Sequence, residues 1–184
     1  PNPEEEEALT LALKKAQEVD ADLVMATDPD ADRVGIAVKN DKNEFVLLNG
    51  NQAACLLIHY MLTAWEKAGK LTGNEYVVKT IVTSYLIDKI AASKNVDCYN
   101  TLTGFKYIGE LMTKFEGQST FIAGGEESYG YLVGEHARDK DAVVSCAMIA
   151  EMVAFYKDQG SSFFEALQIL YLEYVFYKEK LVAL

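Results

Sequence analysis

The sequence predicts an α/β protein in which helices cover a mixed, mainly parallel sheet. Two observations carry this prediction. From about residue 75 onward, short apolar runs typical of buried strands alternate with segments of helical period, which is the pattern of an α/β layer. Ahead of that region, one amphipathic segment and three apolar runs indicate a partial domain of the same type. We place the boundary near Asn49, which gives domains 1–48 and 49–184.

The first domain is expected to begin with a helix over Glu4–Gln17. Its glutamates precede a lysine pair, the order that the helix dipole favours, and Leu9 and Leu13 belong to an apolar stripe. Three strands should follow, at Leu23–Ala26, Val34–Val38 and Phe45–Leu48. Residues 27–33 then form a loop between the first two strands.

The second domain is expected to begin with a helix from Asn49, which can cap it, to about Lys67. The next elements should be strand Tyr76–Val82, helix Ser84–Ala92, strand Val96–Tyr99, helix Lys106–Phe115, strand Thr120–Ala123, helix Ala142–Tyr156 and helix Phe163–Tyr174. The last helix is capped by Ser161 and Ser162 and leads out of the domain. Ligands of such sheets bind at the carboxyl ends of strands, so the loops after Val82, around Thr103 and after Ala123 should lie together.

Composition narrows the class of protein. Half of the 184 residues are hydrophobic, as in an ordinary globular chain, and the net charge of −11 argues against nucleic acid or an anionic membrane surface as a partner. The three cysteines form no Cys-x-x-Cys motif, which fits a reducing cytoplasm better than a disulfide framework or a zinc site. The sequence shows no signal peptide or membrane span, and it begins and ends as if it were part of something larger.

Three alternating aspartates, Asp28, Asp30 and Asp32, follow the first apolar strand. Carboxylates so close together repel one another unless a cation lies among them, and oxygen ligands favour Mg²⁺ or Ca²⁺. A calcium EF-hand is excluded because Arg33 stands where its turn needs glycine and Lys39 stands where it needs glutamate. The adjoining Arg33 suggests a phosphate bound by metal and guanidinium together. A solvated acidic turn without a ligand is the plain alternative.

A second motif follows the strand that ends at Ala123. In the run from Gly124 to Gly130, glycines let the backbone approach a ligand, while Glu126 offers an acceptor and Ser128 a hydroxyl. Such a pair suits the neighbouring hydroxyls of a sugar. By itself the motif is also compatible with an ordinary polar turn.

Taken together, the two motifs resemble those of the phosphohexomutase family, the phosphoglucomutases and phosphomannomutases. The family's metal loop, Asp-x-Asp-x-Asp-Arg, is matched by residues 28–33, and its sugar-specificity loop, Gly-Glu-x-Ser, by residues 125–128. The resemblance implies Mg²⁺ held by Asp28, Asp30 and Asp32. It implies catalytic roles for Arg33, Lys79 and Lys140. It implies a hexose phosphate substrate bound by Thr103, Gly104, Lys106, Gly125, Glu126, Ser128, His136 and Arg138.

The resemblance also implies where the chain belongs in a four-domain enzyme. Residues 1–48 resemble the end of domain 2 with its metal loop, and residues 49–184 resemble domain 3, ending in the linker towards domain 4. The family interconverts sugar 1-phosphate and 6-phosphate through a phosphoserine and a bisphosphorylated sugar. The phosphoserine loop of domain 1 and the phosphate-clamping loop of domain 4 have no match here. Those domains are therefore the expected partners, and the chain alone should be inactive.

Some details qualify the match. Pro29 and Ala31 replace glycines of many members, which implies a stiffer metal loop, and Gly130 replaces a histidine of some phosphomannomutases, which favours the phosphoglucomutase branch. A haloacid-dehalogenase-like phosphatase with Asp28 as nucleophile is one alternative, although it usually needs a residue other than aspartate at position 32. A non-catalytic sugar-phosphate-binding module is another.

Overall fold

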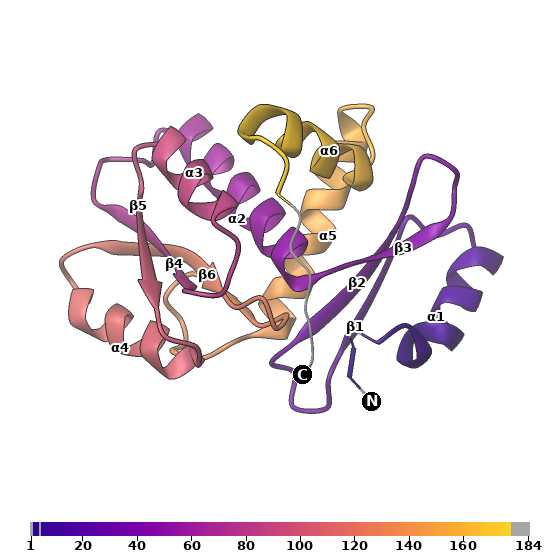
Figure 1. The fold of residues 1–184 in the computed structure, drawn as a ribbon, viewed down its shortest axis with the longest axis horizontal. Coiled ribbons are helices and arrows are strands. Elements are labelled where there is room, and N and C mark those ends of the chain that lie inside the picture. The colour runs from indigo at the N-terminus through magenta and orange to yellow at the C-terminus, as the bar shows by residue number, and fades with distance from the viewer. Residues whose placement is uncertain (1, 4, 178–184) are drawn as a thin grey trace.

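The computed structural model describes residues 2–3 and 5–177 and contains two sheets. A three-stranded sheet lies on one side of helices α5 (Ala142–Asp158) and α6 (Phe163–Tyr174), and a four-stranded sheet lies on the other (Figure 1). Glu4, the expected first helical residue, and residues 178–184 of the expected linker lie outside the described residues. The site described below lies where the loops of the two sheets meet.

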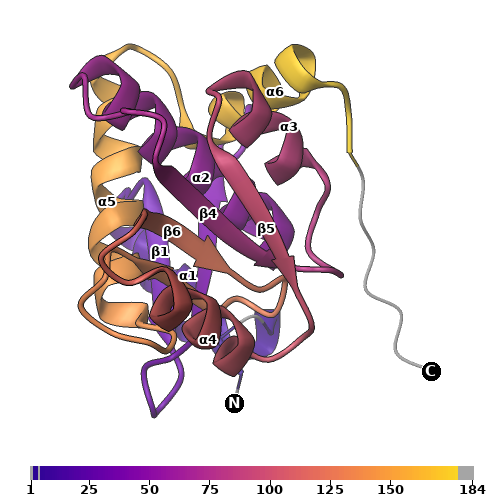
Figure 2. The ribbon, with the colours of Figure 1, turned by 90° about the vertical axis from the view of Figure 1, so that its left-hand side faces the viewer.

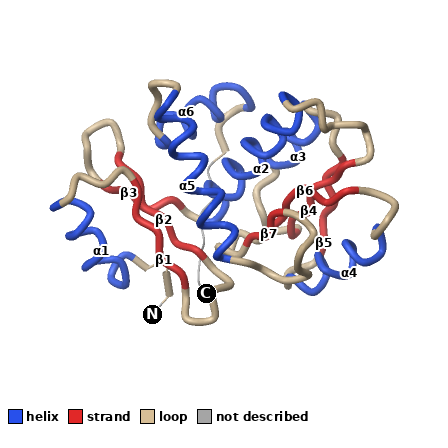
Figure 3. The backbone as a smooth tube through the Cα atoms, turned by 180° about the vertical axis from the view of Figure 1, so that it is seen from behind, coloured by secondary structure: helices blue, strands red, loops and turns tan. Residues whose placement is uncertain are grey.

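The first sheet is antiparallel. It has the order β1-β2-β3, with β1 at Leu23–Thr27, β2 at Val34–Lys39 and β3 at Phe45–Leu48. Helix α1 (Glu6–Glu18) covers one face (Figure 3) and packs Leu9 near Ala37 of β2. Alternate residues of β2, such as Ile36, join the main core on the other face. The central strand is therefore buried on both sides.

The second sheet confirms the predicted mixed, mainly parallel class. Its order is β5-β4-β6-β7, in which β4 (Glu75–Thr80) runs parallel to β5 (Asp97–Thr101) and β6 (Thr120–Gly125), while β7 (Tyr131–Val133) is antiparallel to β6. Helix α4 (Phe105–Phe115) lies on one face, and α2 (Gly50–Lys67) and α3 (Leu86–Ser93) lie on the other (Figure 2).

The alternation of side chains along β4 explains these layers. Tyr76 and Val78 belong to a core cluster with Phe105 of α4, whereas Val77 belongs to the main core with residues of α2 and α3, such as Leu56. Successive side chains of a strand point to opposite faces. Every residue of β4 is buried, as expected for a strand that is covered on both faces.

The predicted helix starts are largely confirmed. Asn49 and Gln52 form a capping box at the start of α2, and Ser162 and Glu165 form another at the start of α6. Asp141 caps α5 by accepting hydrogen bonds from the backbone amides of Val143 and Val144. These polar side chains satisfy amide groups that have no partner within the helix.

The structure corrects several boundaries in the second domain. Strand β4 ends at Thr80 rather than Val82, because Ile81 and Val82 turn outward and are 50% and 54% exposed. Helix α3 begins at Leu86 rather than Ser84. Strand β7 was not predicted, because its three residues are too short to show a period and their place depends on pairing with β6.

Within the described residues, no helix is both long enough and apolar enough to cross a membrane.

Candidate functional site

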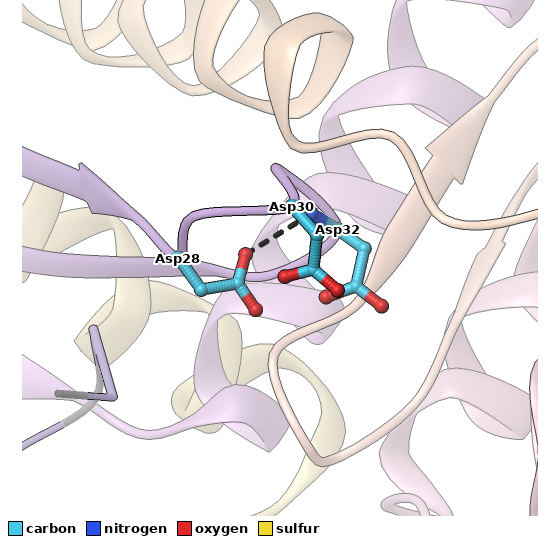
Figure 4. A group of neighbouring side chains, drawn as sticks. All are labelled: Asp28, Asp30 and Asp32. Atoms are coloured by element: carbon cyan, nitrogen blue, oxygen red, sulfur yellow. Dashed lines mark hydrogen bonds between the residues drawn. The ribbon is translucent and has the colours of Figure 1, made fainter.

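The three aspartates gather in the loop between β1 and β2. Asp28 is buried, Asp32 is half-buried and Asp30 is exposed, and one carboxylate oxygen of each lies within 4.8 Å of the others. Figure 4 shows the three carboxylates on the same side of the loop. A compact set of carboxylate oxygens is the donor type that Mg²⁺ prefers. The residues therefore fit this ion, and its binding at this cluster stays a prediction.

Asp28 is held firmly by its own loop. Its Oδ1 accepts hydrogen bonds from the backbone amides of Asp32, at 3.1 Å, and Arg33, at 3.0 Å, and its Oδ2 accepts one from Nε of Arg33 at 2.8 Å. Burial by itself would raise the pKa of Asp28, but the hydrogen bonds from Arg33 and Asp32 outweigh burial and lower the pKa. Asp28 thus stays ionised and presents a fixed carboxylate.

Lys140, in the segment between β7 and α5, reaches the aspartate loop. Its Nζ lies 3.0 Å from Oδ2 of Asp32 and 3.4 Å from Oδ1 of Asp139. Burial acts to lower the pKa of Lys140, but the contacts with these two carboxylates outweigh it and raise the pKa. The stem of Lys140 packs on Gly130, where an added Cβ would lie 2.1 Å from its Cδ. A protonated Lys140 therefore joins the two loops.

The glycine-rich loop follows β6 and turns back sharply. The backbone amide of Glu126 donates to the carbonyl of Gly130 at 2.9 Å, and Oε1 of Glu126 accepts from the amide of Gly104 at 2.9 Å. Gly104 has φ 111°, a conformation that side chains disfavour. Glu126 is buried and Ser128 is exposed at the tip of the loop. The loops after β5 and β6 thus lie together, as the sheet topology predicts.

Two backbone hydrogen bonds join the aspartate loop to the glycine-rich loop and its surroundings. The amide of Val34 donates to the carbonyl of Tyr129 at 3.0 Å, and the amide of Ala142, at the start of α5, donates to the carbonyl of Ala31 at 2.9 Å. Backbone bonds of this kind fix position independently of side-chain rotation. The two motifs therefore lie next to each other in the fold.

Lys79 is placed differently from Lys140. Its side chain is completely buried in β4, and its Nζ lies 3.1 Å from the carbonyl of Thr83 and 3.1 Å from Oδ2 of Asp88. It also lies over the ring of Tyr85, 4.8 Å from the centroid. In this structure Lys79 is not presented to a ligand, and its part in catalysis stays a prediction.

The other predicted binding residues lie in exposed or partly exposed segments nearby. Nε2 of His136 lies 2.9 Å from Oδ2 of Asp141, and Nη1 of Arg138 donates to the carbonyl of Glu135 at 2.9 Å. The Asp141 pKa is lowered mainly by the hydrogen bond with His136. Thr103 and Lys106 are exposed at the start of α4. Their roles in binding remain predictions.

Three residues near the site were not singled out from the sequence. Glu127 bonds to the hydroxyls of Thr80, the last residue of β4, and of Thr83 in the turn that follows, and both threonines are buried. Threonine is a common residue in and around strands, and Glu127 lies more than forty residues away from both threonines along the chain. No local signal in the sequence links these residues.

These features define an α/β protein with a carboxylate cluster and a glycine-rich loop at the carboxyl end of its main sheet. The family model described as phosphoglucomutase/phosphomannomutase, alpha/beta/alpha domain III, matches residues 49–174, and that of domain II matches residues 1–42. The chain therefore belongs to the phosphoglucomutase/phosphomannomutase family.

Curated relatives and solved structures agree with this assignment. A phosphoglucomutase of Staphylococcus saprophyticus is 34% identical over 99% of this chain and 33% of its own length. A phosphopentomutase of Mus musculus is 33% identical over 95% of this chain and 29% of its own length. The crystal structure of a phosphomannomutase candidate from Thermus thermophilus has a TM-score of 0.71 and 25% identity, covering 94% of this chain and 35% of that one. The chain spans about a third of the length of these proteins.

Proposed function

We propose that this chain is the metal-binding and sugar-recognising part of a Mg²⁺-dependent phosphohexomutase that resembles phosphoglucomutase. The observation that carries the proposal is the backbone connection between the aspartate loop and the Gly-Glu-x-Ser loop, which places a carboxylate cluster beside a sugar-type motif. Family membership favours it over a haloacid-dehalogenase-like phosphatase. We assign residues 1–48 to domain 2 and residues 49–184 to domain 3, and we propose a cytoplasmic enzyme, consistent with the free cysteines.

In this proposal Asp28, Asp30 and Asp32 hold Mg²⁺ through carboxylate oxygens. When bound, the ion supplies positive charge that stabilises a neighbouring phosphoryl group during transfer. Arg33 fixes Asp28 through its Nε and adds positive charge to the loop. Lys140 contributes a second cation from the other domain. The cluster can therefore bind an anionic phosphate without a large net negative charge.

Glu126 and Ser128 are proposed to grip the sugar. Glu126 has one oxygen bound to the amide of Gly104, which fixes the direction of its carboxylate, and the exposed Ser128 offers a hydroxyl. Two neighbouring sugar hydroxyls can meet this pair in either orientation of the ring. One site can then serve both half-reactions of a mutase, with catalysis arising mainly from positioning.

The phosphoserine is proposed to come from domain 1 of the same polypeptide, and the phosphate clamp from domain 4. The serines of this chain lack the family's phosphoserine context, and Ser84 and Ser145 are buried. The 184 residues by themselves should therefore give no turnover.

A coupled assay on the complete polypeptide tests this function. Conversion of glucose 1-phosphate to glucose 6-phosphate is followed through a glucose-6-phosphate dehydrogenase, with Mg²⁺ and after chelation. We expect Mg²⁺-dependent turnover that Glu126→Gln and Asp30→Asn each reduce by about a hundredfold or more, while Asp41→Asn in the exposed β2–β3 turn leaves it unchanged. Absence of turnover with glucose, mannose, pentose and N-acetylhexosamine phosphates would refute the mutase assignment. Trapping of an acyl phosphate on Asp28 would instead support a phosphatase.

A further inference from the structure

The Glu127 side chain links the glycine-rich loop to the end of β4. Its Oε2 accepts hydrogen bonds from Oγ1 of Thr80 at 2.9 Å and from Oγ1 of Thr83 at 3.1 Å. Its own backbone amide lies 3.2 Å from Oγ1 of Thr83, and the two threonine oxygens are 2.7 Å apart. Both threonines are at most 1% exposed. Hydrogen bonds to a carboxylate in such a sheltered place are stronger than those between neutral groups.

The turn at Thr80–Ser84, to which Glu127 bonds, is itself fixed by polar contacts. Lys79 is completely buried, and its ammonium binds the Thr83 carbonyl and Asp88. On the other side, the amide of Ser84 donates to Oδ1 of Asn51 at 2.8 Å. A buried charge is retained only where several polar groups satisfy it. The turn therefore offers Glu127 a fixed anchor.

The backbone around Glu127 is also confined. A Cβ added to Gly50 would lie 1.8 Å from the carbonyl oxygen of Glu127, so this carbonyl rests directly on the start of α2. One residue beyond Ser128, the carbonyl of Tyr129 accepts from Val34. Ser128 lies between these two fixed points and is exposed. Its hydroxyl is presented by a loop whose two sides are anchored.

From these contacts we infer that Glu127 is a positioning residue, which clamps the Gly-Glu-x-Ser loop onto the Thr80 and Thr83 hydroxyls and thereby sets the geometry of Glu126 and Ser128 for a sugar. Lys79 contributes to this positioning indirectly, because its ammonium binds the Thr83 carbonyl. The inference rests on the proposed function for its sugar-binding consequence. The clamp itself is a property of this chain.

Amide hydrogen exchange on the complete polypeptide tests the clamp directly. Thr83→Val keeps the shape of the side chain and removes the hydroxyl, whereas Thr83→Ser keeps the hydroxyl. We expect Thr83→Val and Glu127→Gln to speed amide exchange at residues 125–130 by about tenfold or more. In Thr83→Ser, which keeps the hydroxyl, exchange should stay as slow as in the wild type. Glu110→Gln, in an exposed position on α4, is the control and should change nothing. Unchanged exchange in folded Thr83→Val would overturn the inference.

Kinetics of the complete polypeptide test the consequence for the sugar. With glucose 1-phosphate, Thr83→Val should raise KM by about tenfold and change kcat by less than about threefold, with Thr83→Ser close to wild type. A general loss of folded enzyme would lower kcat without this split, and that result would overturn the positioning role. A wild-type polypeptide without mutase turnover would refute the proposed function, while the exchange experiment would still decide whether the clamp exists.

Discussion

At the scale of single residues, each of the three aspartates has a different environment. Both carboxylate oxygens of Asp28 accept hydrogen bonds within the loop, and the carboxylate of Asp32 contacts Lys140. Asp30 is exposed at the turn. The cluster could be predicted because alternate spacing shows in the sequence itself. The contact between Asp32 and Lys140 could not, because it joins residues more than a hundred positions apart.

Asp30 gives a prediction about metal affinity. Asp30→Asn should weaken binding of Mg²⁺ to this chain by about tenfold or more, because it removes a charged oxygen ligand and leaves the bonds of Asp28 intact. Titration calorimetry with Mg²⁺, or Mn²⁺ as a spectroscopic substitute, measures the change. Asp41→Asn removes the same charge from an exposed turn and serves as the control. Equal affinities for both variants would contradict the assignment of the metal ligands.

Glu75 gives a prediction about pH. It is buried at the start of β4, where its carboxylate accepts bonds from Oγ1 of Thr72 at 2.6 Å and from the amides of Thr72 and Gly73 at 2.9 Å and 3.0 Å. Burial acts to raise the pKa of Glu75, but these bonds outweigh it, so the pKa lies below the ordinary value of 4.5. A lowered pKa means that the stabilisation is complete above pH 4.5 and is lost as the pH falls below it.

Glu75→Gln should therefore lower the free energy of unfolding at pH 7 by about 1–3 kcal/mol. The difference from wild type should shrink as the pH is lowered from about 5 to about 3, because wild-type Glu75 then becomes protonated. Urea unfolding at a series of pH values measures this trend. Glu110→Gln, exposed on α4, should show no such trend, and a constant difference for Glu75→Gln would argue against the charged hydrogen bonds.

At the scale of elements, apolar period predicted the order of helices and strands but not every boundary. Ile81 and Val82 extend the apolar run of β4, yet they are exposed. The strand ends at Thr80, and in the turn that follows Thr83 forms a hydrogen bond with Glu127. When hydrogen bonds to a distant loop determine where a turn lies, the hydrophobic pattern of the sequence carries no signal for that turn. The helices α2 and α6, by contrast, carry their own polar caps and were predicted closely.

The start of α2 provides a prediction at this scale. Alanine usually stabilises a helix relative to glycine by about 1 kcal/mol, but Gly50→Ala should destabilise this chain by about 1–3 kcal/mol because its Cβ would overlap the Glu127 carbonyl. The backbone of the glycine-rich loop would have to shift. Urea unfolding gives the sign of the change, and a stabilised variant would show that the loop does not rest on α2.

At the scale of the whole molecule, one core serves both sheets. Val34, Ile36 and Val38 of β2 belong to the same buried cluster as residues of α2, α5 and α6, and α5 also contacts both sheets. The sequence predicts a domain boundary near Asn49 but gives no sign of this packing, because contacts between segments far apart in the chain leave no periodic signal. This shared core holds the aspartate loop at a fixed position relative to the glycine-rich loop.

A shared core predicts cooperative unfolding. Ile36 is 1% exposed in β2, and the single tryptophan, Trp65, packs against the same cluster from α2. Ile36→Ala should lower the free energy of unfolding by about 2–4 kcal/mol, and Trp65 fluorescence and circular dichroism should report the same shift in urea. Leu11→Ala, at a position that is 82% exposed, should leave both transitions in place. If the two sheets unfolded independently, Ile36→Ala would leave the Trp65 transition unchanged, and the aspartate loop would then be free to separate from the sugar-type loop.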